Sequence, residues 1–292
     1  MSAPVVVGVD GSESALEAVR WAAEEARRRH TPLRIVHAQE IPAGYPPGFV
    51  DWHALHEALA AAGRSAVDDA RRAAQEVVAG LTVEAVHVKA GAVPTLTEVS
   101  AHAALVVLGT RGLGGFTGLL LGSTAVEVTA HAQCPVVVVR GAHRAGPVVV
   151  GVDGTPVGEA AIGFAFAEAS ARGTGLTAVH TWTDLLLETA FAGGAAALDF
   201  APLAQQAEEV LGERLAGWQE KYPDVIVTRE VSRDRASRAL LRHAEHAQLV
   251  VVGTRGRGGF QGLLLGSTSQ HLLRHARCPV AVVSTHDGAE GP

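Results

Sequence analysis

The chain has 292 residues, of which 48% are hydrophobic and 18% are charged, and its formal net charge is −6. This length is sufficient for two ordinary domains, and the apolar fraction is too high for a disordered chain. A nucleic-acid-binding protein needs a basic face that displaces counterions from phosphates, so the net negative charge argues against nucleic acid as a partner.

The cysteine content and the hydropathy pattern indicate in which cellular compartment the protein resides. Only two cysteines occur, Cys134 and Cys278, which excludes a disulfide framework and fits a reducing environment. Each precedes a proline, so we expect a packing role, with redox sensing as the alternative. There is no signal-peptide pattern and no apolar run of the roughly 20 residues that a membrane span needs. We therefore expect a cytoplasmic protein without a membrane partner.

Strand and helix patterns alternate along the first half. Residues Val5–Val9 form a continuous apolar run that ends in Asp-Gly, which is typical of a buried parallel strand. Ser12 or Ser14 can cap the helix that follows. The remaining predicted strands cover residues 33–38, 83–88, 105–108 and 136–139, and the remaining predicted helices cover residues 52–79, 95–103 and 124–132.

The second half repeats the first. The run Val5–Gly11 recurs as Val148–Gly154, and Cys134-Pro135 recurs as Cys278-Pro279. The repeat predicts a duplicated domain, with domain 1 over residues 1–143 and domain 2 over residues 144–292. Five strands with intervening helices predict an α/β fold in each domain: a doubly wound, Rossmann-like parallel sheet with strand order 3-2-1-4-5.

A glycine-rich loop follows the fourth strand of each half. The pattern is Gly-x2-Gly, nine residues, then Gly-Ser-Thr, and it occurs as Gly109 to Thr124 and as Gly253 to Thr268. Glycines allow the backbone to approach a ligand closely, and a helix that starts at Gly-Ser-Thr offers free N–H donors to an anion. Two capping boxes are predicted at these helices, Thr124 with Glu127 and Ser267 with Gln270.

An acidic residue ends the first strand of each half, Asp10 and then Asp153. In the order 3-2-1-4-5, the first and fourth strands are neighbours and the winding reverses between them. Ligands in open α/β sheets bind at that switch point, beyond the carboxyl ends of the strands. The carboxylate and the glycine loop are therefore expected to face one crevice, where the carboxylate can accept from ribose hydroxyls or from an adenine amino group.

A glycine loop of this pattern, after the fourth strand and with an aspartate at the end of the first strand, resembles the motif of the ATP-binding branch of the universal stress protein family. The resemblance covers nearly the whole chain, once per half, as in the tandem two-domain type. It implies ATP, with or without Mg²⁺, as the ligand of each half. The implied ligand-binding residues are, in the first half, Val9, Asp10, Gly11, Ala38, Gly109, Gly112, Gly122, Ser123 and Thr124, and in the second half, Val152, Asp153, Gly154, Thr181, Gly253, Gly256, Gly266, Ser267 and Thr268.

Two features of the motif leave alternatives open. Arg111 and Arg255 lie inside the loops, where they either neutralise phosphate charge or point to solvent. The family often has a Gly-x-Pro turn after the third strand. The first half has Gly91 and Pro94 there, whereas the second half has Arg235 and Arg238, which either reach the ligand or face solvent.

The histidines do not suggest catalysis or a metal site. His37 and His180 occupy equivalent strand positions, where we expect buried, hydrogen-bonded side chains. The other histidines have no HExxH spacing, so no metal ligands are expected.

The resemblance implies a nucleotide-responsive regulator of stress or dormancy. A slow ATP hydrolase is one alternative, although the chain has no GxxxxGK[ST] lysine and no recognisable catalytic residues, so at most weak ATPase activity is expected. A nucleotide-free dimerisation module is another alternative. A homodimer and an unidentified regulatory protein partner are the expected associations.

Overall fold

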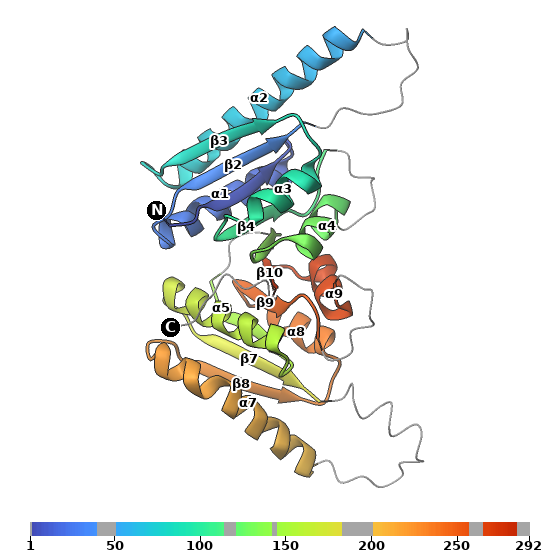
Figure 1. Ribbon diagram of the computed structural model, residues 1–292. Helices are drawn as coiled ribbons and strands as arrows, with labels where there is room; N and C mark the ends of the chain where they lie inside the picture. Colours follow the sequence, from blue (N-terminus) through green and yellow to red (C-terminus); the bar gives the residue numbers. More distant parts are fainter. Residues whose placement is uncertain are drawn as a thin grey trace, which may run out of the picture. The chain divides into compact units, whose positions relative to one another are not determined.

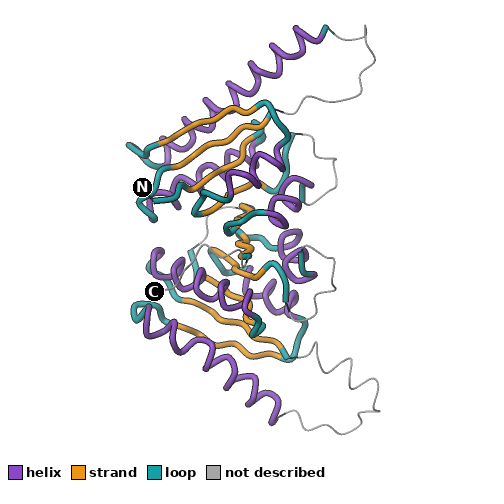
Figure 2. The backbone as a smooth tube through the Cα atoms, in the orientation of Figure 1, coloured by secondary structure: helices purple, strands orange, loops and turns teal. Residues whose placement is uncertain are grey.

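The computed structural model describes residues 2–39, 51–113, 121–141, 145–182, 201–256 and 265–284. The chain divides into two compact units, with the boundary between Arg140 and Gly141. Each unit is a parallel sheet with helices on both faces (Figure 1). Figure 2 shows the alternation of strand and helix along the backbone of each unit.

The described residues of the first unit form five strands in the spatial order β3-β2-β1-β4-β5, and all neighbouring pairs are parallel. This confirms the predicted 3-2-1-4-5 order and the doubly wound fold. Its elements are β1 (Val5–Val9), α1 (Glu13–Arg28), β2 (Leu33–Ala38), α2 (Trp52–Val77), β3 (Val83–Val88), α3 (Ala92–Ser100), β4 (Leu105–Gly109), α4 (Ser123–His131) and β5 (Val136–Val139).

The second unit has the same topology, with its strands in the order β8-β7-β6-β9-β10 and parallel throughout. Its elements are β6 (Val148–Val152), α5 (Pro156–Arg172), β7 (Leu176–Thr181), α7 (Ala201–Lys221), β8 (Val227–Ser232), α8 (Ala236–Ala244), β9 (Leu249–Gly253), α9 (Ser267–His275) and β10 (Val280–Val283).

The central strands are apolar on both faces because helices cover both faces. Val5, Val6 and Val7 are fully buried although successive side chains of a strand point in opposite directions. The helices contribute large buried side chains to each core, including Trp21 of α1 and Phe166 of α5. None of the described helices is both long enough and apolar enough to cross a membrane.

The helix starts differ from the predictions at two places. α3 begins at Ala92 and not at residue 95, so Pro94 lies in its first turn, where a missing N–H costs no intrahelical hydrogen bond. The two predicted capping boxes are wrong, since α4 and α9 are capped by Gly122 and Gly266, and neither cap makes a side-chain hydrogen bond. The cap of α1 is Ser12, one of the two serines proposed from the sequence.

Candidate functional site

The site of each unit lies where the carboxyl ends of two adjacent strands meet. β1 pairs with β4 in the register Val7↔Val107, and β6 pairs with β9 in the register Val150↔Val251. Asp10 follows β1, and the glycine loop follows β4. The structure therefore brings the acidic residue and the loop together at the switch point, as the sequence predicts.

In the first unit, the Asp10 carboxylate holds the loop. Its Oδ1 accepts a hydrogen bond of 3.0 Å from the backbone N–H of Ser12, and its Oδ2 accepts one of 2.7 Å from the backbone N–H of Leu113. Gly11, between strand and helix, has a φ of +91°, a conformation that favours glycine. The carboxylate thus joins the start of α1 to the loop.

The loop is also attached to the first turn of α1. The Ser12 hydroxyl donates to the carbonyl of Arg111 (3.2 Å), and the Ser14 hydroxyl accepts from the Arg111 backbone N–H (3.4 Å). The Ser14 and Thr110 hydroxyls lie 3.3 Å apart. These contacts bring the Thr110–Gly112 backbone against α1.

The N-terminus of α4 is open toward the same loop. The N–H of its cap, Gly122, donates to the carbonyl of Thr110 (2.8 Å), and no side chain caps the helix. The N–H groups of Ser123 and Thr124 belong to the first turn, where an α-helix has no backbone acceptor for them. Together with the positive end of the helix dipole, they form a donor set suited to phosphate.

The glycines of the first loop serve different purposes. A Cβ at Gly109 would lie 2.6 Å from the backbone oxygen of Ser14, and a Cβ at Gly112 would collide with the Asp10 carboxylate. A Cβ at Gly122 would have the Thr110 oxygen as its nearest neighbour, at 3.5 Å. Gly109 and Gly112 are therefore required by contacts within the protein, whereas the described residues leave room above the backbone of Gly122.

The second unit repeats this arrangement with different side chains. The Asp153 Oδ1 accepts from the backbone N–H (2.9 Å) and the hydroxyl (2.7 Å) of Thr155, which caps α5. A Cβ at Gly256 would lie 2.9 Å from the Asp153 Oδ2. The N–H of Gly266 donates to the Thr254 carbonyl at 2.7 Å, so the start of α9 approaches its loop as α4 does.

The other residues implied by the resemblance lie at the same sheet edge. Val9 and Val152 are buried strand ends, so only their backbones can face the crevice. Gly154 has a φ of +75° and occupies the turn equivalent to that of Gly11. Ala38 and Thr181 are the last residues of β2 and β7. The exposed residues of the set are Gly11, Arg111, Gly112, Ser123, Arg255, Gly256 and Ser267.

A largely buried polar cluster that the sequence did not predict lies near Asp10 in the first unit. The rings of His37 and His87 stack, with centroids 4.9 Å apart and an interplanar angle of 7°, and His87 Nε2 lies 2.8 Å from the Gln39 Oε1. α2 can pass over the rings because residue 63 is a glycine. Burial, and to a smaller extent the neighbouring His87, lower the pKa of His37, and the Asp10 carboxylate opposes this shift.

His37 and His180 are both expected to be buried and hydrogen-bonded, and the structure confirms both properties only for His180. Both are buried, but His180 has its Nδ1 2.7 Å from the carbonyl of Val152, whereas the His37 Nδ1 has no hydrogen-bond partner among the described residues. Val231 stands beside His180 where His87 stands beside His37. The halves therefore differ at the end of the crevice that lies beside the second strand.

A further residue that the sequence analysis missed lies beside the first loop. β4 and β5 pair in the register Gly109↔Val139, so Arg140 leaves the sheet next to Thr110. Arg140 is partly buried, and its pKa is lowered by that burial and by the nearby charge of Arg111. The predicted adjacency of the fourth and fifth strands was the signal that could have identified it.

The remaining candidate residues are two arginines at the start of α8 and the two cysteines, and their local surroundings in the protein account for their positions. Arg235 is the exposed N-cap of α8, and the exposed Arg238 lies 3.8 Å from the carboxylate of Asp234. Cys134 and Cys278 are buried, as expected for residues that pack in a core, and burial raises the pKa of the Cys134 thiol to about 12.

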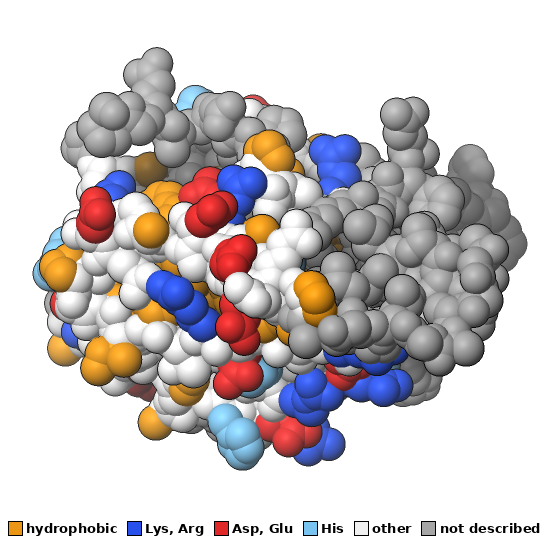
Figure 3. All heavy atoms as spheres, turned by 90° about the horizontal axis from the view of Figure 1, so that it is seen from below, with side chains coloured by type: hydrophobic (Ala, Val, Ile, Leu, Met, Phe, Trp, Pro, Cys, Tyr) orange, Lys and Arg blue, Asp and Glu red, His pale blue; other side chains and the backbone are white. Residues whose placement is uncertain are grey.

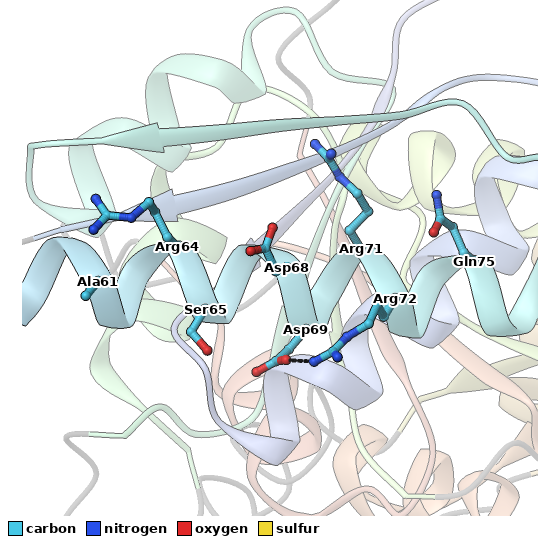
Figure 4. A pocket seen from close by; sticks show the side chains of 8 residues that line it. All are labelled: Ala61, Arg64, Ser65, Asp68, Asp69, Arg71, Arg72 and Gln75. Atoms are coloured by element: carbon cyan, nitrogen blue, oxygen red, sulfur yellow. Dashed lines mark hydrogen bonds and ion pairs between the residues drawn. The ribbon is translucent and has the colours of Figure 1, made fainter.

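Other surfaces of the described residues are less suited to a ligand. An open hollow of about 610 Å³ on α2 is lined by basic, acidic and uncharged side chains of that single helix, and Arg72 pairs with Asp69 there (Figure 4). On the face seen in Figure 3, acidic and basic side chains are interspersed among the described residues. Within the described ranges, no three His, Cys, Asp or Glu side chains are grouped to hold a metal ion.

Comparison with known proteins agrees with this architecture. The model of the universal stress protein family matches residues 1–140 and again residues 145–284. A universal stress protein of Mycobacterium tuberculosis, Rv2623, is 42% identical over 295 residues, which cover 95% of each chain. A universal stress protein of Mycolicibacterium smegmatis is 40% identical and covers 96% of each chain.

Solved structures share the fold at lower identity. A universal stress protein from Archaeoglobus fulgidus superimposes with a TM-score of 0.72 at 17% identity, over 96% of this chain and 98% of that one. The chain therefore belongs to the universal stress protein family, and its two matched segments make it a tandem member.

Proposed function

We propose that this chain is an ATP-binding universal stress protein that binds one nucleotide in the crevice of each half and acts as a nucleotide-responsive regulator of stress or dormancy. In this proposal it is a cytoplasmic, homodimeric binding protein with a regulatory protein partner, and it is not an enzyme. The observation that supports it most strongly is the glycine-capped N-terminus of α4, which opens onto a glycine loop at the switch point and is repeated at α9.

The phosphate end of the proposed site consists mainly of backbone donors. The N–H groups of Ser123 and Thr124, and of Ser267 and Thr268, belong to first turns without side-chain caps. A phosphate chain placed there would accept those hydrogen bonds and be stabilised by the helix dipole. The space over Gly122, where the nearest described atom to an added Cβ is 3.5 Å away, fits a phosphate that approaches the backbone.

The nucleoside end would involve Asp10 and Asp153. Each oxygen of Asp10 accepts one backbone N–H and keeps a further lone pair for a ribose hydroxyl. Because the same carboxylate binds the N–H of Leu113, a ligand that engages Asp10 would also act on the loop. Nucleotide binding would thus bias the loop conformation, which is the physical basis for a nucleotide-dependent signal.

The alternatives make different measurable claims. An ATP hydrolase would release phosphate at a rate that Asp10→Ala abolishes while mock purifications show none, and this result would refute a pure binding role. A nucleotide-free dimerisation module would carry no nucleotide and gain no thermal stability in millimolar ATP. No contact among the described residues favours either alternative over nucleotide binding.

The decisive experiment combines mass spectrometry of the denatured protein with thermal melts in ATP. We expect co-purified adenine nucleotide or a rise in melting temperature with ATP, since a ligand that binds only the folded state stabilises it. The Gly122→Ala/Gly266→Ala double variant should weaken ATP binding by about tenfold or more, because each methyl would lie between the loop backbone and the helix start.

Gly217→Ala is the matched control, because an added Cβ at this helical glycine meets none of the described atoms within 4 Å. It should bind ATP as the wild type does. Wild-type protein that shows neither bound nucleotide nor stabilisation in millimolar ATP would overturn the proposed function.

A further inference from the structure

The residue that follows the second strand differs in chemistry between the halves. Gln39 directly follows β2, and Trp182 directly follows β7. In each unit the residue two positions earlier, His37 or His180, pairs with the last residue of the first strand, so the two positions are equivalent. A glutamine side chain offers an amide donor and a carbonyl acceptor side by side, whereas tryptophan offers a single N–H donor.

The Gln39 side chain is buried and only partly hydrogen-bonded. It is 4% exposed, its backbone N–H donates to the carbonyl of Val88 at 2.7 Å, and its Oε1 lies 2.8 Å from the His87 Nε2. Its Nε2 is buried and has no hydrogen-bond partner among the described residues. Buried amide donors are normally paired, and an unpaired one is costly. This donor therefore indicates a partner that binds beside it.

His87 determines which end of the amide stays unpaired. A carbonyl oxygen only accepts hydrogen bonds, so the 2.8 Å contact with the Gln39 Oε1 places the His87 proton on Nε2. Reversal of the amide would require that proton on the His87 Nδ1, where no acceptor lies among the described residues. The ring itself is held by the stack on His37 and by α2, which passes close over both rings at Gly63.

Gln39 lies at the end of the site that a nucleobase would reach. The proposed phosphate contacts follow β4, the proposed ribose contact is Asp10 after β1, and β1 lies between β4 and β2 in the sheet. Neighbouring strands are about 4.8 Å apart, so the edge offers successive places for the parts of one ligand. A nucleotide with its phosphates at β4 and its ribose at Asp10 extends its base toward the end of β2, where Gln39 is located.

We infer that the Gln39 amide, positioned by His87, binds the nucleobase in the first half and selects adenine over guanine. Its Nε2 donates to a ring nitrogen of adenine, and its Oε1 accepts from the adenine amino group as well as from His87. The second half has Trp182 at this position and Val231 in place of His87, so it discriminates less between the two bases. This inference rests on the proposed function and adds a specificity determinant to it.

The physical reason is the order of donors and acceptors along the edge of each base. Adenine presents an amino donor beside a ring-nitrogen acceptor, and a glutamine amide complements both. Guanine in the same pose presents its carbonyl oxygen where adenine has the amino group, so two acceptors would face one another. An amide free to reverse could serve either base, but His87 fixes the orientation that suits adenine.

The test is calorimetric titration of the full chain with ATP and with GTP, in a Gly266→Ala background that weakens the second site. Gln39→Glu should lower the ratio of ATP to GTP affinity by about tenfold or more, because a carboxylate has no donor for the adenine ring nitrogen. Gln39→Met keeps the length without the amide, and it should weaken ATP binding while GTP affinity changes by about twofold or less. In a Gly122→Ala background, which reports the second half, we expect a smaller ratio.

Two variants separate the positioning of the amide from general effects. His87→Val introduces the residue of the second half and frees the amide to reverse, so GTP affinity should rise and the ratio should fall. Gln75→Glu makes the same chemical change at an exposed position of α2 and should leave the ratio unchanged. Circular dichroism and thermal melts report whether each variant folds. If Gln39→Glu does not fold, the Gln39→Met and His87→Val titrations decide the question.

Failure of this inference is distinguishable from failure of the proposed function. Wild-type protein that binds neither ATP nor GTP refutes both. Protein that binds nucleotide, together with an ATP-to-GTP ratio that is unchanged in a folded Gln39 variant, refutes the role of Gln39 and leaves nucleotide binding intact. A ratio that changes in the Gln39 variants but not in folded His87→Val refutes the positioning role of His87.

Discussion

The Asp10 carboxylate accepts a 2.7 Å hydrogen bond from the backbone N–H of Leu113, which lies 103 positions further along the chain. The residue that suggested ribose recognition in the sequence is thus also a structural link between β1 and the glycine loop. A charged acceptor makes this a comparatively strong hydrogen bond, so the carboxylate helps to hold the loop in this conformation.

Asp10→Ala should therefore loosen the loop of the first half. We expect faster hydrogen exchange at the Leu113 amide and a loss of about 1–3 kcal/mol in the free energy of unfolding, because two backbone donors lose a charged acceptor. Hydrogen exchange read by mass spectrometry checks the first effect, and urea unfolding checks the second. Asp153→Ala is the matched control and should leave Leu113 exchange unchanged; unchanged exchange in Asp10→Ala itself would contradict the link.

Gly109→Ala and Gly122→Ala should behave differently although both glycines belong to one motif. At Gly109 the methyl would be 2.6 Å from the Ser14 backbone oxygen, so we expect a loss of stability of about 1–3 kcal/mol or more from overpacking. At Gly122 the nearest atom is 3.5 Å away, so the cost should be about 1 kcal/mol, as for a less suitable N-cap residue. Urea unfolding of both variants measures the difference, and equal losses would show that the Ser14 contact is not limiting.

Acid should destabilise the first half through His37. Its pKa is lowered in the folded protein, so the unfolded chain takes up the proton first as the pH falls through about 6.5. Stability is then retained above that pH and lost below it, toward the lowered folded-state pKa, with a slope of up to about 1.4 kcal/mol per pH unit.

Hydrogen exchange of the amides in strands β1 to β3, measured between pH 7.5 and 5, reports how the free energy of unfolding of this region changes with pH. His37→Gln should flatten it, while His102→Gln, at an exposed position, should not. A slope in the His37→Gln protein equal to that of the wild type would assign the acid sensitivity to other groups.

The cysteines should be unreactive in the folded protein. Cys134 and Cys278 are both buried, and burial raises the pKa of Cys134 to about 12, so the thiolate form of Cys134, which is the form that attacks a disulfide reagent, is scarce near neutral pH. Titration with Ellman's reagent at pH 8 should label neither thiol in native protein and both in guanidinium. Rapid labelling of native protein would revive the redox-sensing alternative.

Much of the architecture could be predicted from periodicity alone. Strands such as Val5–Val9 and Val83–Val88 agree with their predicted limits because apolar runs and turn residues are local signals. The starts of α3 and α4 could not be predicted as well. A proline is tolerated in a first helical turn, and a glycine can cap a helix, so several starting residues satisfy the same local rules.

The site was predictable as a location and less so as a set of contacts. That Asp10 and the glycine loop face each other follows from strand order, which the repeat and the crossover rule determine. That Gly109 makes room for Ser14 and not for a ligand could not be read from the motif. A close approach by a phosphate and a close approach by the protein backbone both require glycine. Only the tertiary structure shows which of the two a given glycine accommodates.

The sequence by itself determined the duplication, the α/β class, the strand order and the positions of the two loops, because these depend on local patterns that recur in both halves. Only the tertiary structure showed that the Asp10 carboxylate holds the N–H of Leu113 and that the ring of His37 stacks on the ring of His87. These pairs join residues from different strands and loops, so their distances depend on packing that no single segment encodes.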